Sequence, residues 1–108
     1  MLMEKQSSSE ITNNVNSALL DQLGATFKLL DKDLKSKLKI NNGVQIDDLK
    51  VGILSNAGIK KGFIITRVDK KPIQNVEDLM SYLQNKDGGI LIEGVYPDGM
   101  RAYYGFGL

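Results

Sequence analysis

Large apolar side chains are scarce at the start of this chain, and farther along they recur at regular intervals. Residues 4–17 are rich in Ser and Asn, a composition typical of linkers and weakly ordered segments. From about residue 20 onward, apolar residues recur with a period of two in some stretches and 3.6 in others, as in strands and helices. The pattern predicts a linker or weakly ordered segment over residues 1–20 and one folded domain over residues 21–108.

The first half of that domain alternates between apolar and polar positions. Residues 23–30, LGATFKLL, and residues 44–49, VQIDDL, each predict a strand. One face of the first strand carries Ala25, Phe27 and Leu29. Between the strands, Asp31 suits the N-cap of a short helix, which Gly43 would end in a left-handed C-cap.

The middle of the domain combines a buried strand with an amphipathic helix. Residues 63–68, FIITRV, are too apolar for a half-exposed strand, so we expect a central strand covered on both faces. A turn over residues 69–72 follows. Asn75 is a good N-cap, and Asp78 completes an acidic variant of the capping box. The helix has one apolar face, formed by Val76, Leu79, Met80 and Leu83.

The end of the chain predicts a hairpin. Gly88 and Gly89 stop the preceding helix. Residues 90–95 and 100–106 form the two strands, and the Tyr-Pro-Asp-Gly stretch between them has the residues of a type I turn. With one helical turn expected within residues 55–62, the order is β-α-β-(short α)-β-α-β-β. That order predicts an α+β fold.

The amino-acid composition argues against several classes of function. The chain of 108 residues has 14 Lys plus Arg against 13 Asp plus Glu and a net charge of +1, without the basic stripe of a nucleic-acid binder. It has no His and no Cys, so it cannot build a Ser-His-Asp triad or a thiolate metal site. We therefore expect no catalytic residue, metal site or cofactor. Neither a signal-like segment nor an apolar run of membrane-spanning length is present, so we expect no membrane insertion.

Three stretches resemble one known family. They are QLGATF at 22–27, AGIKKGFIITRVDKKPIQNVEDLMSYL at 57–83, and GILIEGVYPDGMRAYYGFGL at 89–108. Their order and local signals are similar to those of a PDZ domain in its circularly permuted, bacterial form. The likeness is closest to the C-terminal PDZ domain of HtrA/Deg-type (Do-like) serine proteases.

The resemblance implies a small PDZ-like β-barrel or sandwich of five to six strands, capped by two helices. It also implies a peptide groove between the strand that LGAT opens and the helix that follows Asn75. The partners would be C termini of peptides or unfolded proteins, together with the serine protease domain of a parent chain. Catalysis would lie outside this chain. The implied location is the periplasm, with the export signal on residues not present here.

The residues give this groove a physical basis. Gly24 lets neighbouring backbone N–H groups turn toward one point, which suits a terminal carboxylate. The strand beyond it would offer an edge for an added peptide strand, and the apolar helix face would take a terminal side chain. The candidate site comprises Leu23, Gly24, Ala25, Thr26, Phe27, Val76, Leu79, Met80 and Leu83.

Some alternatives stay open. Gly24 could form only a bend, and Leu79, Met80 and Leu83 could be core residues, with Met80 the best groove candidate because thioethers suit promiscuous surfaces. The domain could instead assemble a protease oligomer around a closed groove. A terminal stretch with Tyr103, Tyr104, Phe106 and Leu108 suggests such contacts, unless these side chains pack on the sheet. In a sharper form of the assembly role, the Leu108 carboxylate enters a neighbour's groove.

The sequence departs from the family pattern at three places. Phe63 stands where an Asp is usual and is expected to add apolar surface at a rim. Asp69-Lys70 replaces the usual Asn-Gly of a turn, and Ala25 is smaller than the usual aliphatic residue. We expect the fold to tolerate the first two changes.

Overall fold

The computed structural model describes residues 20–86 and 88–107. The predicted linker over residues 1–20 therefore lies almost entirely outside the described residues, as does Leu108. Residues 20–23 are helical. The elements that follow are β1 (Ala25–Leu29), α2 (Lys32–Leu38), β2 (Val44–Leu49), α3 (Ile53–Asn56), β3 (Ile64–Val68), β4 (Lys71–Pro72), α4 (Val76–Gln84), β5 (Gly89–Val95) and β6 (Arg101–Gly107).

One antiparallel sheet contains all six strands. Its main path is β1-β2-β3-β5-β6, and β4 pairs with β3. The predicted α+β, PDZ-like fold and its order of elements are confirmed, with β4 added. The sheet does not close into a barrel, because β1 and β6 are at opposite ends of this path.

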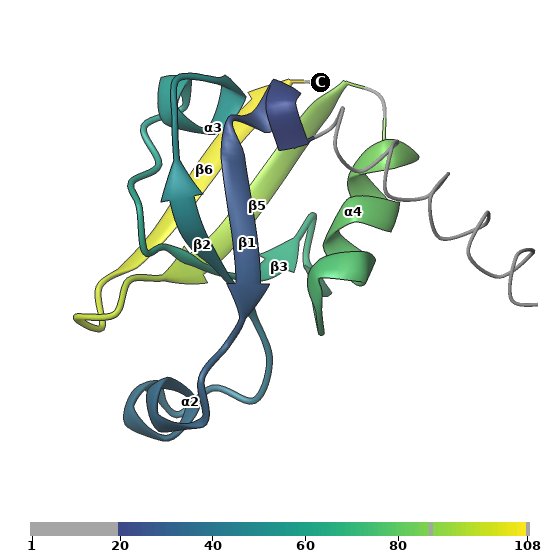
Figure 1. Cartoon of the computed structure of the whole chain (residues 1–108). Helices are drawn as coiled ribbons and strands as arrows, with labels where there is room; N and C mark the ends of the chain where they lie inside the picture. Colours follow the sequence, from purple (N-terminus) through teal and green to yellow (C-terminus); the bar gives the residue numbers. More distant parts are fainter. Residues whose placement is uncertain (1–19, 87, 108) are drawn as a thin grey trace, which may run out of the picture.

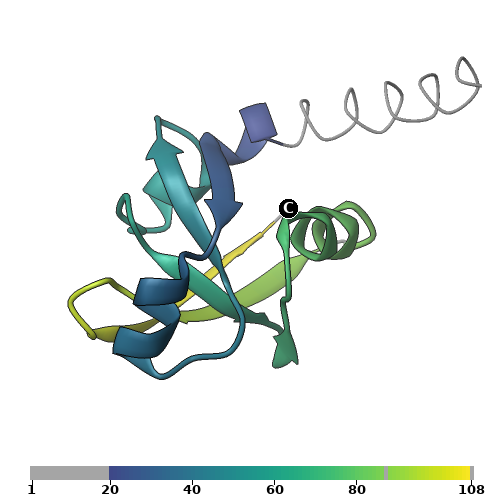
Figure 2. The same cartoon turned by 60° about the horizontal axis from the view of Figure 1, so that its bottom comes forward.

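The helices lie around the strongly twisted sheet. Figures 1 and 2 show α4 beside β1, with α2 below the ends of β1 and β2. The short α3 lies at the other end of the molecule, near the start of β1. This arrangement puts the two elements of the predicted groove, β1 and α4, next to each other in space.

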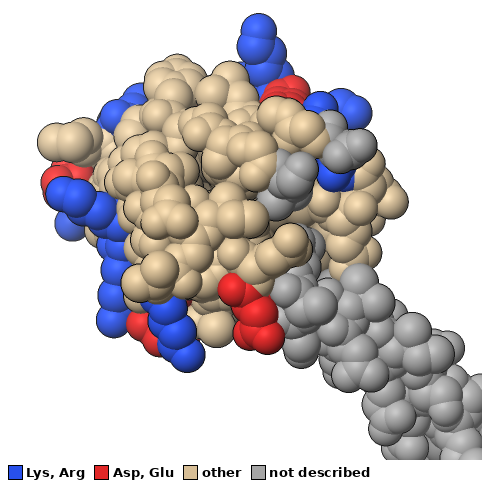
Figure 3. All heavy atoms as spheres, turned by 90° about the horizontal axis from the view of Figure 1, so that it is seen from above, with Lys and Arg blue, Asp and Glu red and all other residues tan. Residues whose placement is uncertain are grey.

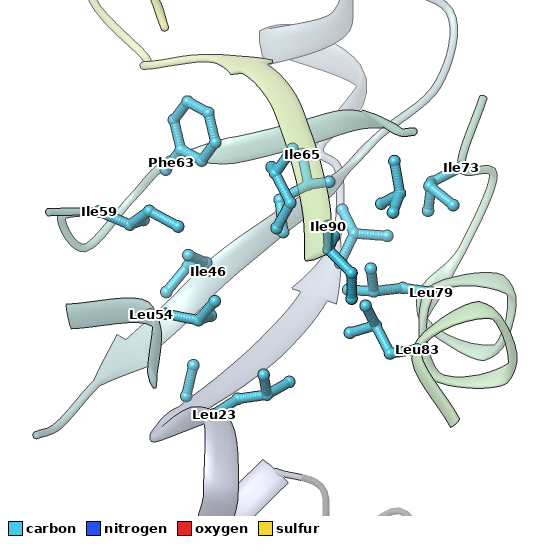
Figure 4. Packing of buried hydrophobic residues seen from close by; sticks show 14 of the residues in the cluster. Leu23, Ile46, Leu54, Ile59, Phe63, Ile65, Ile73, Leu79, Leu83 and Ile90 are labelled. Atoms are coloured by element: carbon cyan, nitrogen blue, oxygen red, sulfur yellow. The ribbon is translucent and has the colours of Figure 1, made fainter. Parts of the chain in front are cut away.

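Buried side chains cover both faces of β3, as predicted for a central strand. Ile65 belongs to the main hydrophobic cluster, which also contains Leu23, Ile46 and Leu79 (Figure 4). Ile64 belongs to a second, smaller cluster that is covered by apolar residues of α2 and the segment after it. The full second cluster is Leu30, Ile64 and Val95, with Leu34, Leu38 and Ile40 packed against it.

The predicted start of α2 is confirmed, and its predicted end is wrong. The Asp33 backbone N–H donates to Asp31 Oδ1 at 3.3 Å, so Asp31 is the N-cap. The C-cap is Lys39, in the left-handed region with φ 58°. Gly43 has another role, because a Cβ there would come within 2.9 Å of Ile64 Cγ2. It lets the chain pass close to β3 as β2 begins.

The turn after β3 is tighter than predicted. Only Asp69 and Lys70 form it, with φ of 50° and 71°, as a two-residue hairpin turn of type I′ requires. Lys71 and Pro72 already pair with β3 as β4. Ile73 lies outside any strand; its N–H donates to the Thr66 carbonyl at 3.0 Å and its side chain is buried.

Candidate functional site

The first wall of the candidate site is an open strand edge. Within the described residues, β1 pairs only with β2. The Lys50 N–H donates to the Gly24 carbonyl at 2.6 Å, and Lys28 lies opposite Gln45. Because successive residues of an antiparallel strand point their backbone groups to alternate sides, a free row of donors and acceptors faces away from β2. That row belongs to Ala25, Phe27 and Leu29.

The second wall is α4. The Asp78 N–H donates to Asn75 Oδ1 at 2.8 Å, and the Gln74 N–H donates to Asp78 Oδ2 at 3.2 Å. The predicted N-cap at Asn75 is therefore confirmed. The predicted capping box is wrong in detail, because the Asp78 carboxylate accepts from the Gln74 N–H rather than from that of Asn75. This cap fixes the rotation of the helix, and its apolar face turns toward the sheet, where Figure 4 shows Leu79 and Leu83 pointing into the core.

Most candidate site residues belong to the core. On α4, Leu79 is 0% exposed and Met80 and Leu83 are each 2% exposed. On the strand side, Leu23 and Ala25 are buried in the same cluster. Contact between these side chains and a ligand stays a prediction.

Three candidate residues keep accessible surface. Phe27 of β1 and Val76 of α4 are each half-buried and pack against the main cluster. They give each wall one partly accessible apolar side chain. Thr26 is exposed.

Gly24 lies in a closely packed turn, called the Gly24 corner below, between the helical residues 20–23 and β1. Its φ is +76°, and its N–H donates to the Leu20 carbonyl at 2.8 Å, as at the end of a helix. A Cβ on Gly24 would come within 2.9 Å of two backbone carbonyl oxygens, those of Lys50 and Val51. The position therefore requires glycine. The N–H groups of Leu23, Gly24 and Ala25 are those predicted to hold a carboxylate, and that of Gly24 is already engaged within the chain.

A small hollow next to Gly24 lies on the β2 side of β1. Its volume is about 120 Å³. The lining residues are Leu20, Asp21, Gly24, Ala25, Thr26, Asp48, Lys50 and Val51. Because none of its lining residues belongs to α4, this hollow is separate from the space between β1 and α4.

A carboxylate anchors the C-terminal end of α4 to the sheet. Asp69 Oδ1 accepts the Leu91 backbone N–H at 2.8 Å, and Oδ2 accepts the Tyr82 hydroxyl at 2.9 Å. Lys86 Nζ lies 3.1 Å from the same Oδ2. The Leu91 N–H, followed by Tyr82 and Lys86, lowers the pKa of Asp69 below its ordinary value. The carboxylate in turn raises the pKa values of Tyr82 and Lys86.

An amide anchors the segment before α4. Asn42 Nδ2 donates to the Thr66 carbonyl at 3.0 Å and to the Ile73 carbonyl at 2.9 Å. Thr66 belongs to β3, and Asp69 directly follows that strand, so both anchors attach α4 to β3. Sequence reasoning missed both residues. The replacement of the family's Asn-Gly by Asp69-Lys70 was the available signal for one of them.

An aromatic cluster fills the region under the β5–β6 hairpin. Phe63 is fully buried, with ring centroids 4.8 Å from Tyr96 and 5.2 Å from Tyr104. The two tyrosine oxygens lie 2.6 Å apart, and burial together with that hydrogen bond raises the pKa of Tyr104 to about 12. Phe63 is therefore packed. Tyr104 and Phe106 pack on the core, whereas Tyr103 is 66% exposed.

Charged residues border one end of the molecule. Figure 3 shows the end near α3 as a broad uncharged surface with lysines and acidic residues at its margin. Among the described residues, no group of three or more acidic side chains is placed to hold a metal ion. In the same part of the chain, no helix has the length and apolar character needed to cross a membrane.

Solved structures share this arrangement, although no family model and no curated protein matches the sequence. The PDZ domain of HtrA3 bound to a phage-derived ligand (FGRWV) is 15% identical, with a TM-score of 0.67. The match covers 79% of this chain and 81% of that domain.

The HtrA-type protease AlgW with a tripeptide is 20% identical, with a TM-score of 0.64, over 77% of this chain and 29% of that one. An AlgW variant with a decapeptide is 17% identical, with a TM-score of 0.68, over 92% of this chain and 33% of that one. These likenesses show that the chain has a PDZ fold. The chain spans about a third or less of the AlgW chains that it matches.

Proposed function

We propose that this chain is a peptide-binding PDZ module of an HtrA/Deg-type serine protease of the periplasm. It would bind apolar C termini or unfolded segments by adding them as a strand to β1. The observation that carries the proposal is the open edge of β1 beside α4. Structures with the same fold, those of HtrA3 and AlgW, contain peptide ligands, which supports this use of the edge.

Main-chain hydrogen bonds would supply affinity with little dependence on sequence. The peptide would pair with the free backbone groups of Ala25, Phe27 and Leu29. Phe27 and Val76 would contact a ligand side chain, and burial of one aliphatic side chain contributes about 1.5 to 3 kcal/mol. Dissociation constants from about micromolar to millimolar are expected for such short peptides.

A terminal carboxylate would bind at the Gly24 corner. The Gly24 N–H donates to the Leu20 carbonyl, so it becomes available only when that bond opens. Carboxylate recognition would therefore reorganise residues 20–23, whereas binding of an internal segment would leave them in place. Substrate cleavage would be performed by the protease domain of the parent chain.

A peptide titration tests this proposal. Amide shifts are recorded with a short peptide that ends in a free Val or Leu, and then with the same peptide amidated. We expect shifts over residues 25–29 and 76–83 with both, and shifts over residues 20–23 that disappear on amidation. No shift with either peptide would contradict the proposal and favour the assembly role.

Matched variants locate the site. Phe27→Ala removes the half-buried side chain of β1 and is expected to weaken binding by about three- to tenfold. Thr26→Ala, on the next residue but exposed, is expected to bind like the parent chain. A single N-methyl group on the peptide, at an N–H that would pair with β1, should abolish binding. Equal losses in both protein variants would contradict binding along this edge.

A further inference from the structure

The second open edge of the sheet belongs to β6. Within the described residues, β6 pairs only with β5, and that pairing runs without a break from Val95↔Arg101 to Gly89↔Gly107. The Tyr96 N–H donates to the Met100 carbonyl at 2.8 Å, which fixes the alternation along β6. The backbone groups of the strand's odd-numbered residues therefore point away from β5. These residues are Arg101, Tyr103, Gly105 and Gly107.

The β6 edge has few of the features that normally prevent an edge strand from pairing with another chain. Lys, Pro and bulges normally keep edge strands from pairing with other chains, and the sequence RAYYGFG of β6 has no Lys or Pro. Its pairing with β5 has no bulge. The only charged residue is Arg101, at the first position. The side chains beside the free backbone groups are exposed, and Tyr103 is 66% exposed.

We propose that β6 pairs antiparallel with β6 of a second copy of this chain, with Tyr104 opposite its counterpart. In this register, the outer face places Arg101 opposite Gly107 of the second copy and Tyr103 opposite its Gly105. On the inner face, Ala102 lies opposite Phe106. Apart from the central Tyr104 pair, each large side chain thus faces a small residue, and an aromatic ring over a cross-strand glycine is a known way to stabilise such pairs.

The two neighbouring registers of the β6–β6 pair form fewer favourable cross-strand contacts. Centring the pair on Tyr103 also puts two tyrosines against each other, and centring it on Gly105 puts two glycines together and Tyr104 opposite Phe106. Both leave residues at the ends of β6 unpaired. The register centred on Tyr104 pairs all of Arg101–Gly107 and keeps the two arginines at opposite ends of the ladder, where they do not repel.

This pairing leaves the peptide edge free. β6 and β1 are at opposite ends of the strand order, so the dimer would be one continuous sheet with a β1 edge at each outer end. The inference does not depend on the proposed peptide binding. If both hold, the dimer would carry two peptide sites.

Sedimentation equilibrium of the full chain tests the dimer at concentrations up to about 1 mM, because small interfaces bind weakly. We expect the mass to rise from 11.9 kDa toward twice that value. Gly105→Lys should remain monomeric. The nearest atom to a Cβ at Gly105 would be the Ile90 carbonyl oxygen at 3.8 Å, so the variant should have the same melting temperature as the parent chain. Leu29→Lys, at the exposed end of β1, is the control and should still dimerise.

Cysteine cross-linking tests the register, since the chain has no Cys. Tyr103→Cys and Gly105→Cys chains are oxidised separately and as a mixture. Paired residues lie about 5.5 Å apart at their Cα atoms, within disulfide range. We expect several-fold more disulfide-linked dimer in the mixture than in either chain alone. A monomer at every concentration, loss of the dimer in Leu29→Lys, or equal cross-linking in all three samples would each overturn the proposal.

Discussion

The two edges of this sheet present the same backbone chemistry in different surroundings. β1 is short, its register with β2 shifts between Thr26 and Phe27, and it starts at the crowded Gly24. β6 runs over Arg101–Gly107 in unbroken register with β5, and its Gly105 has open space around it. The helix α4 lies beside the first edge (Figure 1).

The difference shows that unpaired backbone groups alone do not decide what an edge does. At β1, α4 limits what can approach, and the anchors of α4 on Asp69 and Asn42 set its position. At β6, the exposed Arg101 and Tyr103 would lie opposite glycines of a second copy, which favours a partner of matching pattern. We therefore assign an extended peptide to β1 and a second copy to β6.

Replacing one glycine at each edge gives the largest contrast. Gly24→Ala puts a side chain at φ +76° and within 2.9 Å of two carbonyl oxygens, so the free energy of unfolding should fall by about 3 kcal/mol or more. Gly105→Ala meets nothing within 3.8 Å and should change it by less than about 0.5 kcal/mol. Urea denaturation measures both. Similar losses of unfolding free energy in the two variants would show that Gly24 is not more crowded than Gly105.

The anchor of α4 gives the next largest effect. Asp69→Ala leaves the Leu91 N–H, the Tyr82 hydroxyl and Lys86 without their shared acceptor. We expect a loss of about 1 to 2 kcal/mol in urea denaturation, and weaker peptide binding because α4 is less firmly placed. Asp47→Ala is the control, because its carboxylate forms an exposed ion pair with Lys28. An unchanged stability in Asp69→Ala would show that other contacts hold the helix.

The same anchor predicts a pH dependence. The pKa of Asp69 is lowered in the folded state, so its contribution is present above the unfolded value of about 4 and is lost as the pH falls through the folded pKa. Asp69→Asn should therefore be less stable than the parent chain at pH 7, with a gap that narrows in acid. Urea denaturation between pH 7 and about pH 2 tests this. A gap of constant size would assign the effect to packing rather than to the charge.

The smallest effect is expected from the ion pair between β1 and β2. Lys28 Nζ lies 3.7 Å from Asp47 Oδ1, and both side chains are more than half exposed. Such pairs contribute little because water and salt screen them, so Lys28→Ala should change the free energy of unfolding by less than about 0.5 kcal/mol. A larger loss would mean that the charged surface at this edge stabilises β1.

Most of the helices and strands could be predicted from short stretches of sequence. The N-caps at Asp31 and Asn75 bond to residues two or three positions ahead, so they are visible in any short window of sequence. The end of α2 at Lys39 was missed because Gly43 is the residue type that usually ends helices. Glycine is needed at position 43 because the chain passes close to Ile64 there. Ile64 is distant in sequence, so no local pattern reveals this contact.

The candidate site was predictable in outline only. The meeting of β1 and α4 was expected from the resemblance to PDZ domains. The anchors at Asn42 and Asp69 join residues between 13 and 31 positions apart, and sequence spacing gives no sign of such pairs. The apolar face of α4 was recognised, but the same pattern describes core residues and groove residues. Only packing places Met80 in the core.

The tyrosine pair under the β5–β6 hairpin makes the chain its own optical probe. The sequence has no Trp and only four Tyr, so its near-ultraviolet absorbance comes chiefly from tyrosine. Tyr104 keeps its proton to a pH of about 12 while it is buried against Tyr96. An unfolded tyrosine ionises near pH 10. Between these values, phenolate absorbance from this residue would report opening of the hairpin without any attached label.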